Sequence, residues 1–113
     1  MRAILINTQT RTVKEVEYNG ELEQAYSLLN CRMVEPVYIE KEDCIYVDEE
    51  GLYSVDDNSV FFTYKGAHQP FCGNGLVVGS DLETGATVGS KNTVEEIRAR
   101  VDFLSAHQVR SQC

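Results

Sequence analysis

The chain has 113 residues, of which 42% are hydrophobic and 25% charged, a composition that predicts one folded domain and excludes a disordered chain. No apolar run approaches the roughly 20 residues of a membrane-spanning helix, and the stretch at residues 3–6 is too short for a secretion signal, so we expect a cytoplasmic protein without membrane contact. The formal net charge of −8 repels phosphate backbones and therefore predicts no direct nucleic-acid binding.

The first part of the chain predicts a hairpin followed by a helix. Residues 3–6 (AILI) form a continuous apolar run, which is typical of a strand covered on both faces. Residues 12–18 (TVKEVEY) predict the second strand, after a polar turn at residues 9–11. Residues 21–30 predict a helix, because the apolar side chains recur at helical spacing along one stripe: Leu22, Ala25, Tyr26 and Leu29.

The middle of the chain predicts strands separated by polar turns. The strand-forming stretches are residues 34–39, 43–47, 60–64 and 76–78. Residues 48–51 (DEEG) predict a turn in which Gly51 takes a positive φ, after which Leu52 and Tyr53 briefly resume a strand. Residues 65–70 predict a loop, and the glycines around the last strand predict close approach of backbones rather than a phosphate-binding loop.

The end of the chain predicts one amphipathic helix. Thr93 and Glu96 have the spacing of a capping box, in which each side chain bonds the backbone of the other residue. A narrow apolar stripe continues that helix, at Val94, Ile97, Val101 and Leu104. From His107 onward we expect a fraying polar tail, so residues 1–106 form the domain and residues 107–113 the tail.

Together these stretches predict an α+β fold with the order ββαβββ(β)α. We expect a largely antiparallel sheet of about five to six strands with two helices against it. The opening hairpin–helix order invites comparison with β-grasp folds, on element order alone. The stripe on the last helix can pack on its own sheet or on a second copy, which leaves a homodimer open.

The negative charge is concentrated in the first half, where residues 1–57 carry 13 acidic and 5 basic side chains. The acids between residues 40 and 57 lie in turns at irregular spacing, unlike the fixed ligand positions of a calcium loop, so solvated turns are the better interpretation and no metal is predicted. They also form a candidate surface for a partner protein with a basic surface. The candidate partner-binding residues are Glu42, Asp43, Asp48, Glu49 and Glu50.

The four cysteines contain no CxxC pair, so free thiols are expected, with no cofactor. His68 and Cys72 are four residues apart, a spacing found in zinc sites, but two further ligands are not apparent. The same two residues would be the base and nucleophile of an enzyme; since Cys72 enters a strand between Phe71 and Gly73, a buried inert thiol is the better interpretation.

A candidate ligand site lies in the polar loop after the 60–64 strand. Loop residues there would bind a nucleotide-type molecule, with Arg98 or Arg100 beside its phosphates. Because they are two apart, these arginines point to different sides of a helix and do not form one patch. The candidate ligand-binding residues are Tyr64, His68, Gln69, Asn74 and Arg98.

Nearly the whole chain resembles a known family. The resemblance rests on MRAILINTQTRTVKEVEYNGELEQAYSLLNC, IYVDEEGLY, FFTYKGAHQPFCGNGLVVGSDLETG and TVEEIRARV. It is to small acidic bacteriophage and mobile-element proteins that are catalogued only as a domain of unknown function. The resemblance implies no known activity and therefore assigns no functional residues.

These observations favour a non-enzymatic intracellular binding protein. The resemblance implies phage or mobile-element origin, and with the one-sided acidity, the small size and the lack of a catalytic grouping it leads us to expect action on a host protein of the DNA-handling or defence machinery. The first alternative is a small-ligand binder that sequesters a nucleotide-type signal, and the second is an enzyme using Cys72 and His68.

Overall fold

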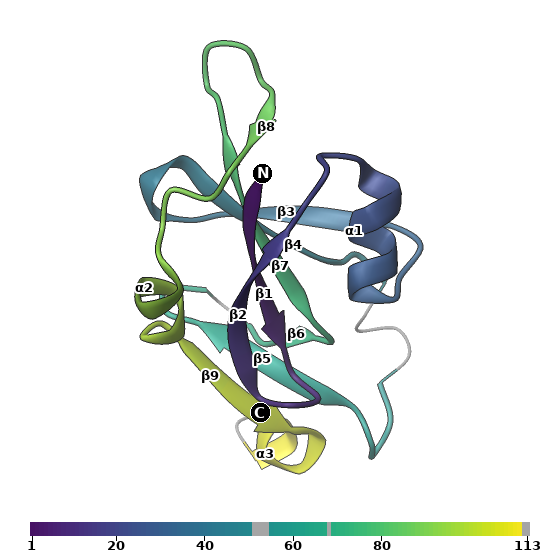
Figure 1. Cartoon of the computed structure of the whole chain (residues 1–113). Coiled ribbons are helices and arrows are strands. Elements are labelled where there is room, and N and C mark those ends of the chain that lie inside the picture. Colours follow the sequence, from purple (N-terminus) through teal and green to yellow (C-terminus); the bar gives the residue numbers. More distant parts are fainter. Residues whose placement is uncertain (51–54, 68, 112–113) are drawn as a thin grey trace.

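The fold consists of two antiparallel sheets with short helices around them (Figure 1). The computed structural model describes residues 1–50, 55–67 and 69–111, the last three by their backbone only. The predicted turn glycine Gly51 and the short strand at Leu52 and Tyr53 lie outside the described residues. The elements are β1 (Arg2–Asn7), β2 (Thr12–Glu17), α1 (Leu22–Leu29), β3 (Val34–Tyr38), the 3-10 turn η1 (Glu40–Glu42), β4 (Asp43–Asp48), β5 (Val60–Tyr64), β6 (Phe71–Cys72), β7 (Gly75–Ser80), β8 (Thr87–Val88), α2 (Val94–Arg98), β9 (Val101–Ser105) and α3 (Ala106–Ser111).

The larger sheet has the strand order β2-β1-β7-β4-β3, and β8 pairs with the end of β7. Every strand pairing in the described chain is antiparallel. The predicted α+β fold with a mostly antiparallel sheet is therefore confirmed, although the described residues form three short helices rather than two. The comparison with β-grasp folds stays a prediction.

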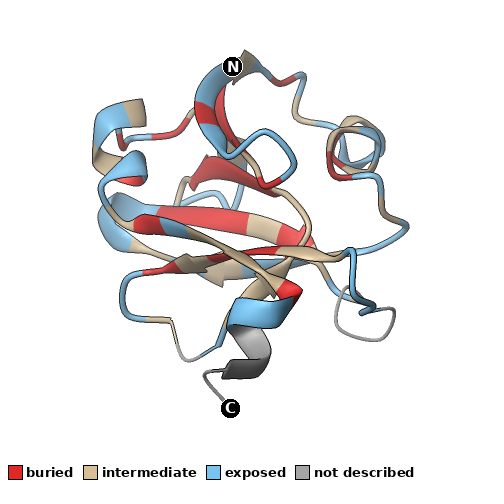
Figure 2. Cartoon of the chain, turned by 90° about the horizontal axis from the view of Figure 1, so that it is seen from below, coloured by how far each residue is buried: buried red, intermediate tan, exposed pale blue. Residues whose placement is uncertain are grey.

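Both faces of the larger sheet are covered, which explains its continuous apolar runs. Alternate residues of a strand point to opposite faces. In β1, Ile4 and Ile6 therefore join the core against the smaller sheet, whereas Ala3 and Leu5 face α1. The other strands divide in the same way, with Ile45, Val47 and Val77 on the first face and Cys44, Leu76 and Val78 on the second. Figure 2 shows the buried residues gathered along the strands.

The smaller sheet has the order β6-β5-β9. Its last strand lies where the sequence predicted the continuation of a helix, so that prediction is wrong for the end of the chain. The capping box is confirmed, since Thr93 Oγ1 accepts from Glu96 N at 3.1 Å and Thr93 N donates to Glu96 Oε1 at 3.0 Å. The helix ends at Arg98, however, and Val101–Ser105 is a strand paired with β5. The predicted fraying tail instead begins as helix α3, which contacts β5 and β9.

The edges of the larger sheet are protected against pairing with another chain. On β3, Ile39 N donates to Asp43 O and Glu49 N donates to Met33 O. In this register the backbone nitrogen of Pro36 points away from β4, toward the open side of the edge strand. Because proline has no N–H, this position offers no hydrogen-bond donor to an added strand. On β2, the guanidinium of Arg98 donates to Val13 O at 2.9 Å. Among the described residues, none of the helices has the length and apolar character needed to span a bilayer.

Candidate functional site

A groove runs between the β3–β4 edge of the larger sheet and the β5–β6 connection of the smaller sheet. It consists of an apolar hollow of about 390 Å³, a polar hollow of about 370 Å³ and a small one of about 80 Å³ between them. The small hollow shares Gln69 and Phe71 with the apolar one, and Asp48 and Cys72 with the polar one. Because they share these residues, the three hollows form one groove, which we call the seam.

The apolar end of the seam has aliphatic and aromatic walls. Val37 and Ile39 contribute from the end of β3, and Ala67 and Phe71 contribute from the opposite side. The Phe71 ring lies against Phe62 of the core, with centroids 5.2 Å apart. These four side chains are partly buried and pack on the core between the sheets, so the floor of the hollow is continuous with that core.

A polar cluster closes the apolar end. Tyr64 donates to Glu40 Oε2 at 3.1 Å, and Arg100 Nε lies 3.0 Å from the same oxygen. Burial raises the pKa of Tyr64, so its hydroxyl keeps its proton and remains a donor. Arg100 balances Glu40, and Lys65 also lines this hollow, so this end of the seam is not acidic.

The middle of the seam is acidic. Glu35 from β3 and Glu49 after β4 line the small hollow together with Asp48. Glu35 and Glu49 are exposed, and within the part of the chain that the structure describes neither has an ion-pair partner. Asp48 is half-buried, and its Oδ1 accepts from Glu50 N at 2.9 Å, which fixes the carboxylate in the turn. Three carboxylates therefore face the seam at this point.

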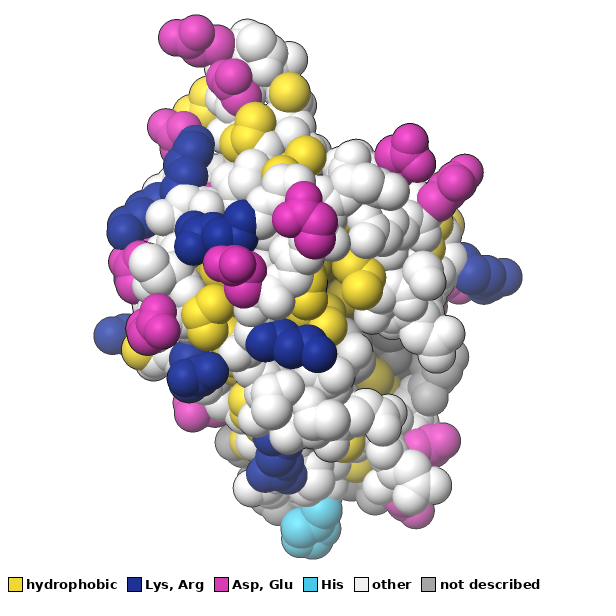
Figure 3. All heavy atoms as spheres, in the orientation of Figure 1, with side chains coloured by type: hydrophobic (Ala, Val, Ile, Leu, Met, Phe, Trp, Pro, Cys, Tyr) yellow, Lys and Arg dark blue, Asp and Glu magenta, His cyan; other side chains and the backbone are white. Residues whose placement is uncertain are grey.

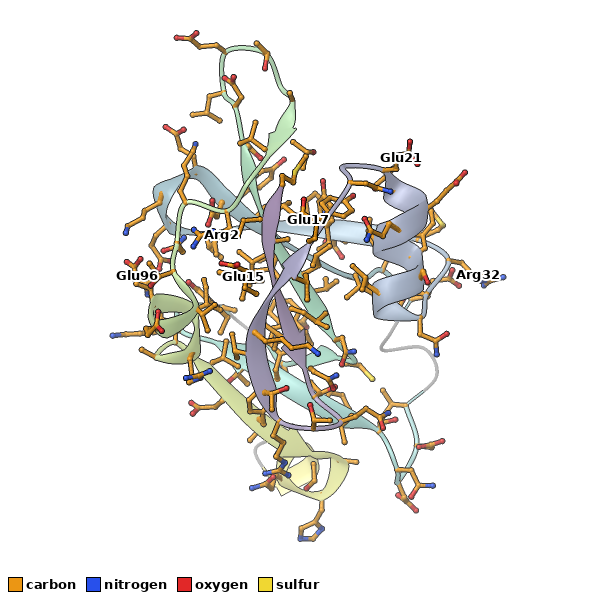
Figure 4. The ribbon with its side chains drawn as sticks, viewed as in Figure 1. Arg2, Glu15, Glu17, Glu21, Arg32 and Glu96 are labelled. Carbon is orange, nitrogen blue, oxygen red and sulfur yellow. The ribbon has the colours of Figure 1, made fainter. Side chains whose placement is uncertain are left out.

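The polar end lies between the end of α1, the β1–β2 turn and Asn74. Asn74 Oδ1 accepts from the backbone nitrogen and hydroxyl of Thr8, at 2.9 and 3.0 Å. Arg32 donates to Glu50 Oε2 at 2.9 Å, and its side chain is 83% exposed. Figure 4 shows Arg32 extending away from the body of the protein. An exposed pair of this kind contributes at most about 1 kcal/mol, so another cation can replace Arg32.

Two cysteines, Cys31 and Cys72, line the polar end. Burial, followed by the charge of Asp48, raises the pKa of both thiols, and Asp56 also raises that of Cys72. Both therefore stay protonated at neutral pH, which does not favour a nucleophile. Among the described residues, no three His, Cys, Asp or Glu side chains are grouped to hold a metal ion. His68, the other residue of the predicted zinc or catalytic pair, lies outside the described residues.

The structure combines two sites that the sequence suggested separately. From the candidate ligand site, Tyr64, Gln69 and Asn74 line the seam. From the candidate partner surface, Asp48, Glu49 and Glu50 line it as well. The loop and the acidic turn therefore form the two walls of one groove, although Asp48 and Gln69 are 21 positions apart along the chain.

Three candidate residues lie elsewhere. Arg98 is held by Val13 O, and Arg100 rather than Arg98 lies beside Tyr64. Glu42 pairs with Lys91 at 2.8 Å. The prediction of a solvated turn is wrong for Asp43. Its side chain is fully buried and accepts a hydrogen bond from Ser90 Oγ at 2.7 Å. Asp43 therefore has no surface to offer a partner.

The sequence analysis did not identify the seam residues Glu35, Val37, Tyr38 and Phe71. Tyr38 is 74% exposed at the end of β3, where it lines the apolar hollow. The only signal in the sequence was the alternation around Pro36, which is typical of an edge strand. Nothing in that pattern says which segment lies opposite.

Basic side chains gather on a different part of the surface. Figure 3 shows Lys and Arg side chains beside α2 and over β2. Several of them are paired there, since Lys41 contacts Glu96 at 2.7 Å and Arg2 lies 3.7 Å from Glu15 (Figure 4). Arg32, Lys65 and Arg100 lie at the two ends of the seam, so its acidic middle is the part that is separated from basic side chains.

Comparison with known proteins identifies a family but no characterised relative. No curated protein matches the chain, and no solved structure matches it. The family model that does match, described as a domain of unknown function (DUF3846), covers residues 1–102. This confirms the resemblance to a domain of unknown function, whereas phage or mobile-element origin stays a prediction; the chain belongs to that family.

Proposed function

We propose that this chain is a binding protein without catalytic chemistry, and that its ligand is a basic segment of another protein held in the seam. The observation that carries this proposal is the acidic middle of the seam. There Glu35, Asp48 and Glu49 face the groove, and their charges attract and orient a cationic partner.

The proposal assigns selectivity to these charges more than affinity. Each exposed carboxylate contributes about 0.2–1 kcal/mol to a pair with lysine or arginine. Three such pairs supply about 3 kcal/mol at most, whereas a micromolar complex needs about 8 kcal/mol. Contacts with the apolar walls of the seam therefore have to supply much of the remaining binding free energy.

The absence of catalytic chemistry is part of the same proposal. It is supported by the raised pKa of the Cys72 thiol, which burial, Asp48 and Asp56 keep protonated. The wider setting, a phage or mobile-element protein acting in the cytoplasm on a host DNA-handling or defence protein, comes from the sequence resemblance and stays a prediction. A nucleotide-type ligand also stays a prediction.

A peptide-binding measurement tests the proposal. The probes are two fluorescein-labelled peptides of the same length with the same apolar residues, one rich in lysine and the other with glutamate in place of each lysine, followed by fluorescence anisotropy. We expect only the lysine-rich peptide to bind, more weakly as salt rises, because salt screens exposed charges.

Two double variants make the measurement specific to the seam. Glu35→Gln with Glu49→Gln should weaken binding about tenfold, because two pairs of about 0.7 kcal/mol are lost. Glu21→Gln with Glu23→Gln changes the net charge equally, on exposed residues at the start of α1, and should leave binding unchanged. Equal weakening by both pairs would show that net charge alone attracts the peptide and would contradict the proposal.

A further inference from the structure

We infer that the bound segment carries a large apolar side chain, best an aromatic one, which fills the apolar end of the seam next to its cationic residues. The inference rests on the proposed function and adds the chemistry of the partner's anchor. It follows from the shape, charge and neighbours of the 390 Å³ hollow.

The first argument is chemical complementarity. The walls of the hollow are Val37 and Ile39 on one side and Ala67 and Phe71 on the other. Hollows of roughly 300–1,000 Å³ with apolar walls are the usual size and character of binding pockets. An aromatic side chain buries 150–250 Å², so one such side chain has a large apolar surface to place against these walls.

The second argument is charge. Among the described residues that line the apolar hollow, Glu40 is the one acid, and Arg100 and Tyr64 already engage its Oε2 at 3.0 and 3.1 Å. Lys65, which lines the same hollow, repels a further cation. A cation entering here gains little, because Glu40 is already compensated. The cations of the partner are instead attracted to Glu35 and Glu49, which have no ion-pair partner among the described residues.

The third argument is the exposure of Tyr38. Tyr38 is 74% exposed at the rim of the hollow. Burial of this residue therefore contributes almost nothing to the stability of the fold. Tyrosine at the rim of a pocket supplies a large contact area at low entropic cost when a partner binds. Because Tyr38 follows Val37 and pairs with Cys44 of the α1 face, its ring reaches a bound segment around the free edge of β3 and would cover it from outside.

The mode of binding follows from Pro36. A peptide that adds a strand to β3 needs donors along the outer edge, and Pro36 offers none at its middle. Insertion of a side chain into the seam does not depend on these backbone bonds. The structure thus favours an anchor in a hollow over strand addition.

The test is a selection from a random-sequence peptide display library against the whole chain, with no assumption about the partner. We expect the selected peptides to combine lysine or arginine with one large apolar residue, most often tryptophan, phenylalanine or leucine. A representative selected peptide is then synthesised, labelled and measured with variants of the chain.

Ala67→Phe fills the hollow from its own wall and should weaken that peptide at least tenfold. The control is Ala86→Phe, which adds the same ring at an exposed position of the β7–β8 hairpin and should have no effect. Because Ala67→Phe can disturb the loop, Tyr38→Ala at the exposed rim serves as a second variant and should weaken binding several-fold. Thermal unfolding of each variant confirms that it is folded.

The outcomes separate the two claims. Selected peptides that are merely basic and bind Ala67→Phe and Tyr38→Ala as well as the unchanged chain would overturn the anchor, while the proposed function stands. A selection that enriches no basic peptides, or peptides unaffected by Glu35→Gln with Glu49→Gln, would overturn the proposed function itself.

Discussion

Asn92 holds Asp43 with two hydrogen bonds, from its backbone nitrogen at 3.0 Å and its side-chain Nδ2 at 2.9 Å, both to Asp43 Oδ2. Lys91 N adds a bond to Oδ1 at 2.9 Å, and Ser90 Oγ adds one to Oδ2 at 2.7 Å. The carboxylate is fully buried. It therefore fixes the segment before α2 to the start of β4, close to the edge that carries the seam.

Asp43→Asn should destabilise the fold by about 3 kcal/mol. The substitution keeps the shape but replaces one acceptor oxygen by a donor that faces other donors, and buried bonds to a charged group are worth about 1.5–3 kcal/mol each. Urea unfolding with an unchanged slope measures the loss. Asp102→Asn, at an exposed position on β9, is the control. A loss below about 0.5 kcal/mol at Asp43 would contradict the account.

Gly79→Ala should destabilise the chain far more than Gly89→Ala. A Cβ at Gly79 would lie 2.3 Å from Gly89 O, and a backbone atom inside the sheet cannot move aside, so we expect a cost of about 3 kcal/mol. A Cβ at Gly89 would meet nothing closer than Arg2 O at 3.4 Å. Thermal unfolding of both variants checks the difference, and equal midpoints would show that the strands do not approach as described.

The lowered pKa of Glu96 predicts how the stability of the fold changes with pH. The Lys41 ammonium, and then the Thr93 backbone N–H, hold the pKa of Glu96 at about 2, below the usual 4.5. A carboxyl with a lowered folded-state pKa stabilises the fold above its unfolded pKa, and this contribution is lost as the pH falls from about 4.5 through about 2.

Glu96→Gln should flatten that part of the stability curve, because glutamine can still accept from Thr93 but does not titrate. Urea midpoints measured from neutral pH down to about pH 2 test this. The curves of the unchanged chain and the variant should converge as the pH falls. Curves that run parallel would show that Glu96 does not titrate as expected.

Cys31 and Cys72 should react slowly with iodoacetamide at neutral pH. Burial and the charge of Asp48 raise both pKa values and so lower the thiolate fraction. Asp48→Asn should accelerate both reactions, whereas Glu83→Gln in the exposed β7–β8 turn should not. Peptide mapping by mass spectrometry gives the rates. Rapid alkylation of Cys72 in the unchanged chain would indicate a reactive thiolate and would favour the enzyme alternative.

Local signals in the sequence predicted most of the strands correctly. The continuous apolar run at residues 3–6 indicated a strand covered on both faces, and β1 lies between the smaller sheet and α1. The glycines around β7 indicated close backbone approach, and Gly79 lies against Gly89. In each case a single pattern was enough, because burial on both faces or a missing Cβ leaves a direct trace in the sequence.

The end of the chain could not be predicted in this way. Val94, Ile97, Val101 and Leu104 recur at helical spacing, but Val101 and Phe103 also alternate with Asp102 as in a strand. Neither glycine nor proline marks the end of α2 after Arg98. Val101–Ser105 forms a strand because it pairs with the free edge of β5. A local sequence pattern carries no information about such a tertiary partner.

The seam was only partly predictable for the same reason. The acidic turn and the loop after β5 were identified, but as separate sites, since sheet packing alone brings Asp48 and Gln69 to one hollow. The error at Asp43 has a local cause. Its charge predicted exposure, whereas the donors from Ser90 to Asn92 satisfy it in the interior.

Chemical-shift mapping of the labelled chain with the lysine-rich peptide tests the central claim most directly. The account predicts that the perturbed backbone amides cluster along the seam, at Glu35, Tyr38, Glu49, Gln69 and Cys72, with α1 and β2 unchanged. Perturbations centred on Glu21 and Glu23 of the α1 region, or spread evenly over all exposed acids, would contradict it.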